Sequence, residues 1–275
     1  MTETDTMVRQ RDGSVVHLRL NRPAAGNSID VPLARALMEA SIECDEDDSV
    51  RCVLLTGEGR LFCAGGDIQS FIAAGTSAPA LLKELTGYLH MALARFARMD
   101  KPLVCAVNGP AAGAGVGLAV LADIVLAARS AHFTLAYSSI GLSPDGGCTW
   151  LLPRLIGLRR AQELVLANQR ISAQDAERLG LITRAVDDAL LAEEAKRLAC
   201  QLADSATHAL GHARRLLLSS FDTSFESHLE AEARSIAELG RSEHFREGIA
   251  AFTGKRKPNF AHERVTPSGP ADAQS

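Results

Sequence analysis

The chain has 275 residues, of which 47% are hydrophobic and 23% charged, and its formal net charge is -4 at pH 7. This length and composition suffice for a substantial hydrophobic core, in one large domain or two small ones. The small negative charge argues against nucleic acid or a membrane surface as a partner. The polar N-terminal segment is unlike a signal peptide, and no uninterrupted apolar run reaches about 18 residues, so a soluble cytoplasmic protein is predicted.

Six cysteines are scattered through the chain, mostly within apolar runs, and no two of them have the CxxC spacing. They are Cys44, Cys52, Cys63, Cys105, Cys148 and Cys200. This pattern is typical of reduced, buried thiols in a cytosolic enzyme. We therefore expect no disulfide and no structural zinc.

Strand-like and helix-like segments alternate through most of the chain. The first half predicts a strand over 14–21, a loop over 21–27, a helix over 31–43, a strand over 52–55 and a helix over 80–99. The second half predicts strands over 124–128 and 132–136, two helices within 149–168 broken at Pro153 and at Gly157, and a helix over 172–179. Such alternation implies parallel strands joined by helical crossover connections.

The strand signal ends near Ala192, and the remaining pattern is helical. Helices are predicted over 193–202, 206–219, 225–239 and 243–252. This shift divides the chain into a core over 1–205, whose residues 1–7 are expected to be disordered, a C-terminal helical region over 206–260, and a disordered tail over 261–275.

The stretch from Val104 to Asp123, VCAVNGPAAGAGVGLAVLAD, combines an apolar strand, a glycine-rich bend and an apolar helix. Gly113, Gly115 and Gly117 leave backbone N–H groups accessible at the positive end of a helix dipole, where a negatively charged oxygen can bind. Tight helix packing explains the same glycines about equally well. The GxGxG spacing differs from the GxGxxG of dinucleotide sites, and no GxxxxGK[ST] phosphate loop occurs.

A second glycine turn, FCAGGD at residues 62–67, follows the strand predicted over 52–55. Together with NGPAAGAGVGLA at residues 108–119, it resembles the two signature segments of the enoyl-CoA hydratase/isomerase (crotonase) superfamily. The resemblance extends from LNRP, near Leu20, to about Asp187, and includes GLSPDGGCTWLLPRLIG and RISAQDAERLGLI. It implies an α/β fold in which a spiral of ββα repeats binds acyl-CoA and a C-terminal helical region forms trimers.

The resemblance also implies an oxyanion hole for a thioester carbonyl, made by the backbone N–H groups of Gly66 and Ala114. Ala114 stands where the family usually has glycine, but only its N–H is needed. Residues expected to contact the acyl-CoA are Ala24, Ala64, Gly66, Asp67, Ile68, Gly113, Tyr137 and Leu142. Coenzyme A belongs to the substrate, so no separate cofactor and no metal are implied, and the expected assembly is a homotrimer or a dimer of trimers.

The carboxylates decide which reaction is expected. Hydratases of this family carry two glutamates, and the matching residues here are Gly117 and Tyr137, so the usual acid and base of hydration are missing. Asp145, in GLSPDGG, matches an aspartate that faces the acyl chain in isomerases of the family. The same turn chemistry also suits an aspartate that only caps the next helix. Tyr137 could bond the substrate or only fill the space of the missing glutamate, and both interpretations stay open.

The resulting hypothesis is an acyl-CoA isomerase in which Asp145 moves a proton from C2 to C4 of an enoyl-CoA, or assists the rearrangement of a ring epoxide in a phenylacetyl-CoA-type thioester. The alternatives are an enoyl-CoA hydratase-like lyase, an acyl-CoA hydrolase or dehalogenase that uses Asp145 as a nucleophile, and a non-catalytic acyl-CoA-binding module.

Overall fold

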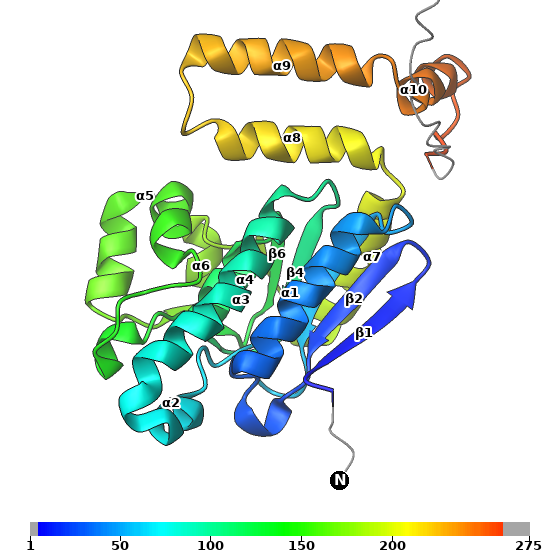
Figure 1. The fold of residues 1–275 in the computed structure, drawn as a ribbon. Helices are drawn as coiled ribbons and strands as arrows, with labels where there is room; N and C mark the ends of the chain where they lie inside the picture. Colours follow the sequence, from blue (N-terminus) through cyan, green and yellow to red (C-terminus); the bar gives the residue numbers. More distant parts are fainter. Residues whose placement is uncertain (1–4, 261–275) are drawn as a thin grey trace, which may run out of the picture.

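A computed structural model describes residues 5–260, and its centre is a six-stranded β-sheet (Figure 1). In order across the sheet, the strands are β1 (Met7–Asp12), β2 (Val15–Leu20), β3 (Cys52–Gly57), β4 (Leu103–Val107), β6 (Ile124–Ala128) and β9 (Arg184–Val186). β1 is antiparallel to β2, and the other neighbours pair in parallel. A smaller sheet joins β5 (Ala111–Ala112), β7 (His132–Thr134) and β8 (Ile171–Ser172).

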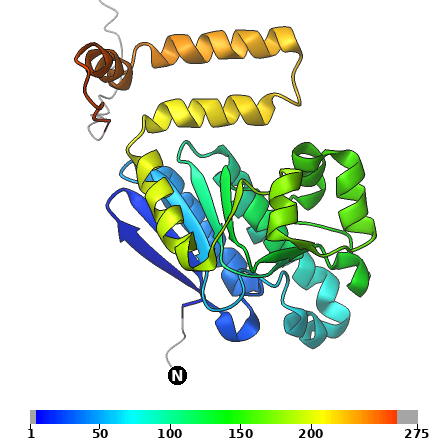
Figure 2. The ribbon, with the colours of Figure 1, turned by 180° about the vertical axis from the view of Figure 1, so that it is seen from behind.

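Helices cover both faces of the larger sheet, as crossover connections between parallel strands require. The core helices are α1 (Val31–Glu46), α2 (Ile68–Ala74), α3 (Ala78–Arg98), α4 (Ala114–Val120), α5 (Cys148–Leu166), α6 (Ala173–Leu179) and α7 (Leu191–Ala203). α1 and α3 pack together on one face, and α7 contacts β3 and β4 on the other (Figures 1 and 2). The predicted α/β class and its alternating elements are confirmed.

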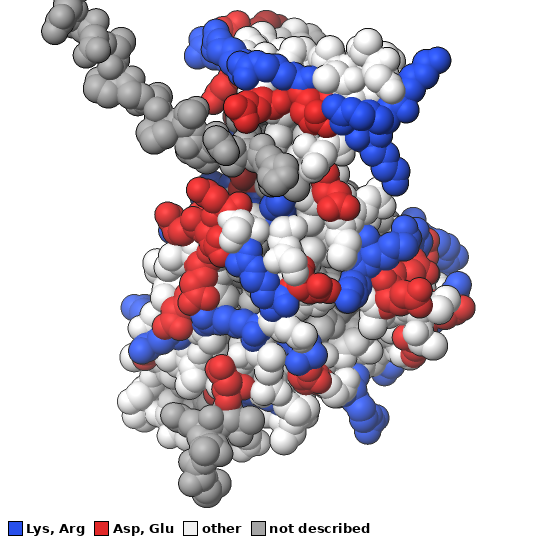
Figure 3. Space-filling view, turned by 90° about the vertical axis from the view of Figure 1, so that its right-hand side faces the viewer, with Lys and Arg blue, Asp and Glu red and all other residues white. Residues whose placement is uncertain are grey.

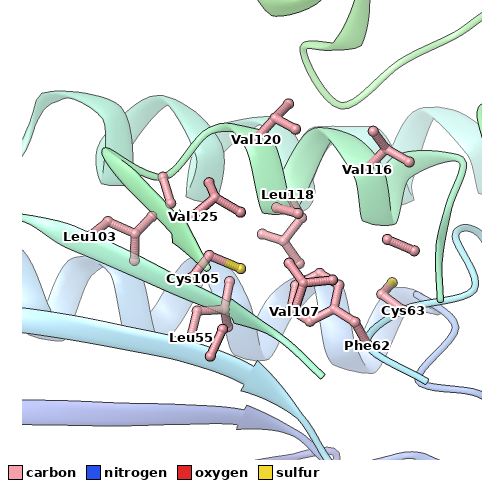
Figure 4. Close-up of a cluster of buried hydrophobic side chains, with 14 of the residues drawn as sticks. Leu55, Phe62, Cys63, Leu103, Cys105, Val107, Val116, Leu118, Val120 and Val125 are labelled. Atoms are coloured by element: carbon pink, nitrogen blue, oxygen red, sulfur yellow. The ribbon is translucent and has the colours of Figure 1, made fainter. Parts of the chain in front are cut away.

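The interior around β3, β4 and α4 is filled by aliphatic side chains, by the ring of Phe62 and by the thiols of Cys63 and Cys105 (Figure 4). Every residue of β4 and of α4 is buried. A parallel strand covered on both faces needs such a continuous apolar run, and a helix that is apolar all round must be enclosed. Packing on all sides therefore holds the glycine bend between β4 and α4 in place.

Three C-terminal helices extend from the core as an arm (Figures 1 and 2). They are α8 (Thr207–Ser219), α9 (Phe225–Leu239) and α10 (Glu243–Thr253). α8 lies next to the core, and α9 lies beyond it. Arg214 anchors α8, because its Nε donates to Asp123 Oδ1 at 2.7 Å and its Nη2 to the Phe96 carbonyl oxygen at 2.9 Å. α8 runs through Gly211 so close to the core that an added Cβ would lie 2.5 Å from the Asp100 carboxyl.

The distribution of charged side chains on the surface and the burial of the cysteines are consistent with the composition. Acidic and basic side chains are interspersed over the face shown in Figure 3, without a continuous basic patch there. Within residues 5–260, no helix is both long and apolar enough to span a membrane. All six cysteines are free thiols, and five of them are buried.

The structure differs from the sequence-based expectations at the N-terminus and at Pro153, and it leaves the expected C-terminal tail undescribed. Met7 begins β1 and is buried, so the expected disorder of residues 1–7 is wrong for Met7; residues 1–4 and the expected tail 261–275 lie outside the described residues. β1 was not predicted because it is an edge strand whose last four residues are exposed and polar. α5 breaks only at Gly157, with φ 76°, and continues through Pro153, which removes a single helical N–H.

Candidate active site

The first glycine turn places Gly66 just before α2. The N–H of Ile29 donates to the Gly65 carbonyl oxygen at 2.7 Å, and the Ile29 carbonyl accepts from the Asp67 N–H at 3.0 Å. In a parallel pairing of this kind, the N–H of the residue between those two partners points away. Among the backbone hydrogen bonds of residues 5–260, the Gly66 N–H donates none. The turn therefore presents one unused donor.

The second turn presents another unused donor, at Ala114. Ala114 is the first residue of α4, so its N–H has no partner within the helix. The preceding Gly113 has φ 51°, offers no capping side chain, and uses its own N–H on the Thr134 carbonyl oxygen at 3.0 Å. In the described part of the chain, the Ala114 N–H donates no hydrogen bond. It lies at the positive end of the α4 dipole.

The two turns pack backbone against backbone. The Ala112 N–H donates to the Cys63 carbonyl oxygen at 2.9 Å. A Cβ on Gly65 would lie 2.8 Å from the Ala112 oxygen, and one on Gly115 would lie 2.5 Å from the Cys63 oxygen. Only glycine permits such an approach. The contact brings the turns that carry Gly66 and Ala114 together, and two neighbouring N–H donors can stabilise one oxyanion.

A partly buried ion network fixes the first turn. The Arg22 guanidinium lies 2.8 Å from Asp67 Oδ2 and 3.0 Å from Asp30 Oδ2. Asp67 also accepts from the N–H groups of Gln69 and Ser70 and so caps α2. Burial disfavours the charge on Asp67, but the bonds from Arg22 and from the two N–H groups outweigh it and hold the Asp67 pKa below its ordinary value. Asp67 therefore orients the turn that contains Gly66.

Asp145 lies in the loop before α5, and its side chain does not cap that helix. The N-cap residue of α5 is Gly147, without any side-chain capping bond. Instead, Tyr137, in the 3₁₀ helix η3 (Tyr137–Ile140), donates its hydroxyl to Asp145 Oδ1 at 2.5 Å. Burial, reinforced by Cys148 and Asp145, raises the pKa of Tyr137 far above its ordinary value, so the phenol stays protonated. This geometry disfavours the interpretation of Asp145 as a helix cap.

His90, from α3, is a neighbour of Asp145 that the sequence did not reveal. Its Nε2 lies 3.3 Å from the Gly146 nitrogen and 3.8 Å from Asp145 Oδ2. The Gly146 N–H is a donor, so Nε2 is the acceptor of this hydrogen bond. The sequence carried no signal for it, because His90 is half-exposed and lies outside the buried apolar face of its helix. A neutral imidazole at this place can act as a base.

The loop that carries Asp145 packs on the first turn of α4. A Cβ on Gly146 would lie 3.5 Å from Ala114 Cα, and a Cβ on Gly117 would lie 2.2 Å from the Gly146 carbonyl oxygen. A glutamate at position 117, as in hydratases, would therefore require the backbone to move. The structure packs Gly146, the residue after Asp145, against Ala114 and leaves no room for a carboxylate at Gly117.

The other expected contact residues lie around these turns. Ala24 is exposed in the 3₁₀ helix η1 (Pro23–Ala25), and the neighbouring Gly26 carbonyl accepts from the Ala64 N–H at 2.9 Å. Ile68 and Leu142 are 43% and 37% exposed and thus available to a ligand. Gly113 is buried between the turns, and its added Cβ would lie 3.8 Å from Tyr137 Cζ. A cavity at the base of the arm, lined among others by Asp100, Asp204 and His208, shares no residue with this site.

Comparison with known proteins identifies the family. Residues 10–263 match the protein family described as enoyl-CoA hydratase/isomerase. The chain is 42% identical to a 1,2-epoxyphenylacetyl-CoA isomerase of Escherichia coli strain K12 over 90% of this chain and 94% of that protein. It is 33% identical to a 4-chlorobenzoyl coenzyme A dehalogenase of an Arthrobacter species over 92% of each. A crystal structure of an enoyl-CoA hydratase from Polaromonas sp. JS666 matches with a TM-score of 0.88 and 35% identity, covering 92% of this chain and 98% of that one.

The chain therefore belongs to the enoyl-CoA hydratase/isomerase (crotonase) family, as its two glycine turns predicted, and has the crotonase fold. The protein is an acyl-CoA enzyme of this family. The names of these relatives cover isomerase, dehalogenase and hydratase reactions, so the reaction must be argued from the site.

Proposed function

We propose that the protein is an acyl-CoA isomerase that shifts a double bond in an enoyl-CoA or rearranges a ring epoxide in a phenylacetyl-CoA-type thioester. One observation carries this proposal: the loop that carries the Asp145 carboxylate packs at Gly146 against Ala114, whose N–H is unused, while Gly117 and Tyr137 occupy the positions of the two hydratase glutamates. One carboxylate that accepts and returns a proton suffices for isomerisation. The 1,2-epoxyphenylacetyl-CoA isomerase among the relatives supports the same choice.

In the proposed reaction, the N–H groups of Gly66 and Ala114 hold the thioester oxygen. Asp145 takes a proton from C2 of a 3-enoyl-CoA, and the electron pair moves into the carbonyl to form an enolate. The same proton returns to C4 as the double bond shifts to C2–C3, so no atom is gained or lost. Each oxyanion donor is expected to lower the barrier by about 3 kcal/mol. This reaction needs no metal and no redox cofactor, because it only moves a proton within the substrate. Coenzyme A is part of the substrate and is not a separate cofactor.

A spectrophotometric screen tests the proposal with 3-enoyl-CoA, 2-enoyl-CoA and epoxidised phenylacetyl-CoA. We expect turnover of the 3-enoyl-CoA or of the epoxide and little hydration of the 2-enoyl-CoA. Preferential hydration of the 2-enoyl-CoA would instead identify a hydratase-like lyase. If nothing is turned over while CoA thioesters still raise the melting temperature, the protein is a non-catalytic acyl-CoA-binding module.

His90 favours a second candidate, hydrolytic substitution. Asp145 would attack the carbon that carries a leaving group such as a halide, which departs with its electron pair, and His90 would deprotonate the water that hydrolyses the resulting ester. The relatives named 4-chlorobenzoyl-CoA dehalogenases point to an aryl halide. Mass spectrometry during a single turnover decides: an ester on Asp145 supports substitution, and its absence removes this candidate.

We further propose that the arm assembles the protein into a homotrimer or a dimer of trimers. Several large apolar side chains of the arm are more than two-thirds exposed, which is costly in water. They are Leu217, Phe221, Phe225, Ile236 and Phe252. Sedimentation at micromolar concentration should show at least three copies of the 29.2 kDa chain. A monomer would contradict the assembly.

A further inference from the structure

The two oxygens of Asp145 have different surroundings. Oδ1 accepts the Tyr137 hydroxyl at 2.5 Å. Oδ2 faces His90 Nε2 at 3.8 Å, but the lone pair of that nitrogen is directed to the Gly146 N–H, so that nitrogen donates nothing to Oδ2. Among the hydrogen bonds of the described residues, Oδ2 has no donor. The Tyr137 hydroxyl therefore fixes Oδ1 by a hydrogen bond, and Oδ2 is available to a substrate proton.

The Tyr137 hydroxyl, which donates to Asp145 Oδ1, belongs to a side chain with a fixed position. Tyr137 is only 9% exposed, so its ring has a fixed position, whereas a quarter of the Asp145 side chain is exposed. Burial raises the pKa of Cys148, the next ionisable group beside the pair, to about 12, and Asp145 adds to this effect. The groups that face the carboxylate are thus a protonated phenol, a protonated thiol and His90. Of these, the phenol alone donates a hydrogen bond to it in this structure.

We propose that Tyr137 is a positioning residue, which turns the Asp145 carboxylate so that Oδ2 is the oxygen that takes up and returns the substrate proton. A hydrogen bond to an ionised carboxylate also favours the ionised form, which is the form able to act as a base. This inference rests on the isomerase function proposed above. It replaces both interpretations that the sequence left open: the Tyr137 hydroxyl serves Asp145 and not the substrate, and the residue does not merely fill the space of a missing glutamate.

Tyr137→Phe tests the inference, because it keeps the ring and removes only the hydroxyl. We expect kcat for a 3-enoyl-CoA to fall roughly 10-fold or more, the scale of one hydrogen bond to a charged group, with little change in KM. The acidic limb of the kcat/KM profile should move to higher pH by about one unit, because the ionised carboxylate loses its donor. Repeating the profile in a His90→Gln background shows whether the limb belongs to His90 instead.

A fluorinated tyrosine at position 137 strengthens the hydrogen bond to Asp145, whereas Tyr137→Phe removes it. The chain has only two tyrosines, so 3-fluorotyrosine incorporated into a Tyr88→Phe protein labels Tyr137 alone. A more acidic phenol is a stronger donor, and the acidic limb should move to lower pH. Tyr88→Phe with ordinary tyrosine is the matched control. Tyr88 bonds Arg35 at 3.0 Å and does not touch the Asp145 cluster, so its loss should leave kcat and the pH profile unchanged.

A merely space-filling Tyr137 predicts another result: Tyr137→Phe and the fluorinated protein would both keep the native kcat and pH profile, which would overturn the inference. Should Tyr137→Phe fail to fold, the fluorinated protein alone decides. Failure of the proposed function is recognised separately, because the native protein itself would then turn over neither a 3-enoyl-CoA nor the epoxide, whatever happens at Tyr137. Isomerisation retained by Asp145→Asn would show that Asp145 is not the base.

Discussion

The candidate site consists of a backbone half and a side-chain half, which the protein builds in different ways. The backbone half is the pair of N–H groups on Gly66 and Ala114. Its surroundings are packed so tightly that a single added carbon on Gly65, Gly115 or Gly117 would lie 2.8 Å or less from a carbonyl oxygen. A change there must move the main chain, which is why these donors have so little freedom.

The side-chain half comes from three separate segments and is partly open to solvent. Tyr137 comes from η3, Asp145 from the loop before α5, and His90 from α3. The side chains of Asp145 and His90 are 25% and 50% exposed. Here one side chain can be replaced without moving the backbone. The difference explains how one fold can host several reactions: the backbone half fixes the thioester, and the side-chain half sets the chemistry.

Ala114→Pro should have the largest effect on the backbone half. Proline suits the first position of a helix, so α4 can form, but it removes the N–H and places a ring carbon where the thioester oxygen would bind. We expect kcat/KM for a 3-enoyl-CoA to fall by about 100-fold or more, the scale of one oxyanion-hole donor. Thermal unfolding measured in parallel reports whether the helix survives.

Ala114→Gly is the matched control, because it keeps the N–H. It should leave kcat/KM nearly unchanged and lower the free energy of unfolding by no more than about 1 kcal/mol. A proline variant as active as the glycine variant would show that the Ala114 N–H plays no part in catalysis.

Gly117→Ala tests the contact between the two halves. Its Cβ would lie 2.2 Å from the Gly146 carbonyl oxygen, so the loop carrying Asp145 must shift. We expect the free energy of unfolding to fall by about 3 kcal/mol, measured by denaturant titration. Gly87→Ala, within α3, is the control: its Cβ meets nothing within 4 Å, so it should gain roughly 0.5–1 kcal/mol. Equal stability of the two variants would refute the close packing.

Arg22→Met should have a smaller effect, transmitted through Asp67. It removes the cation that lies between Asp67 and Asp30 and should cost about 2 kcal/mol of stability and about 10-fold in kcat/KM. Because the pKa of Asp67 is lowered in the folded protein, its stabilisation is present above the unfolded value of about 3.9 and is lost as pH falls through the folded value.

The difference in unfolding free energy between Arg22→Met and the native protein should therefore narrow as the pH is lowered below about 4. A gap that stays constant down to pH 2 would show that Arg22 does not act through the ionised Asp67.

The sequence predicted the backbone half because its signals are local. Consecutive glycines such as Gly65 and Gly66 mark a turn without reference to the rest of the chain. Asp145 was found through its motif, but its bond to Tyr137 depends on side-chain directions that no pattern encodes. His90 lies 56 residues before Gly146, and their contact depends on how α3 packs, so only the structure could reveal it.

The central claim is that Asp145 transfers the substrate proton, and Asp145→Asn tests it most directly. Asparagine keeps the size and shape of the side chain but cannot act as a base. The measurement compares kcat for isomerisation of a 3-enoyl-CoA by the two proteins, with acyl-CoA affinity determined by calorimetry. We predict that kcat falls by at least about 100-fold while affinity is little changed. An asparagine variant that isomerises the substrate at the native rate would contradict the account.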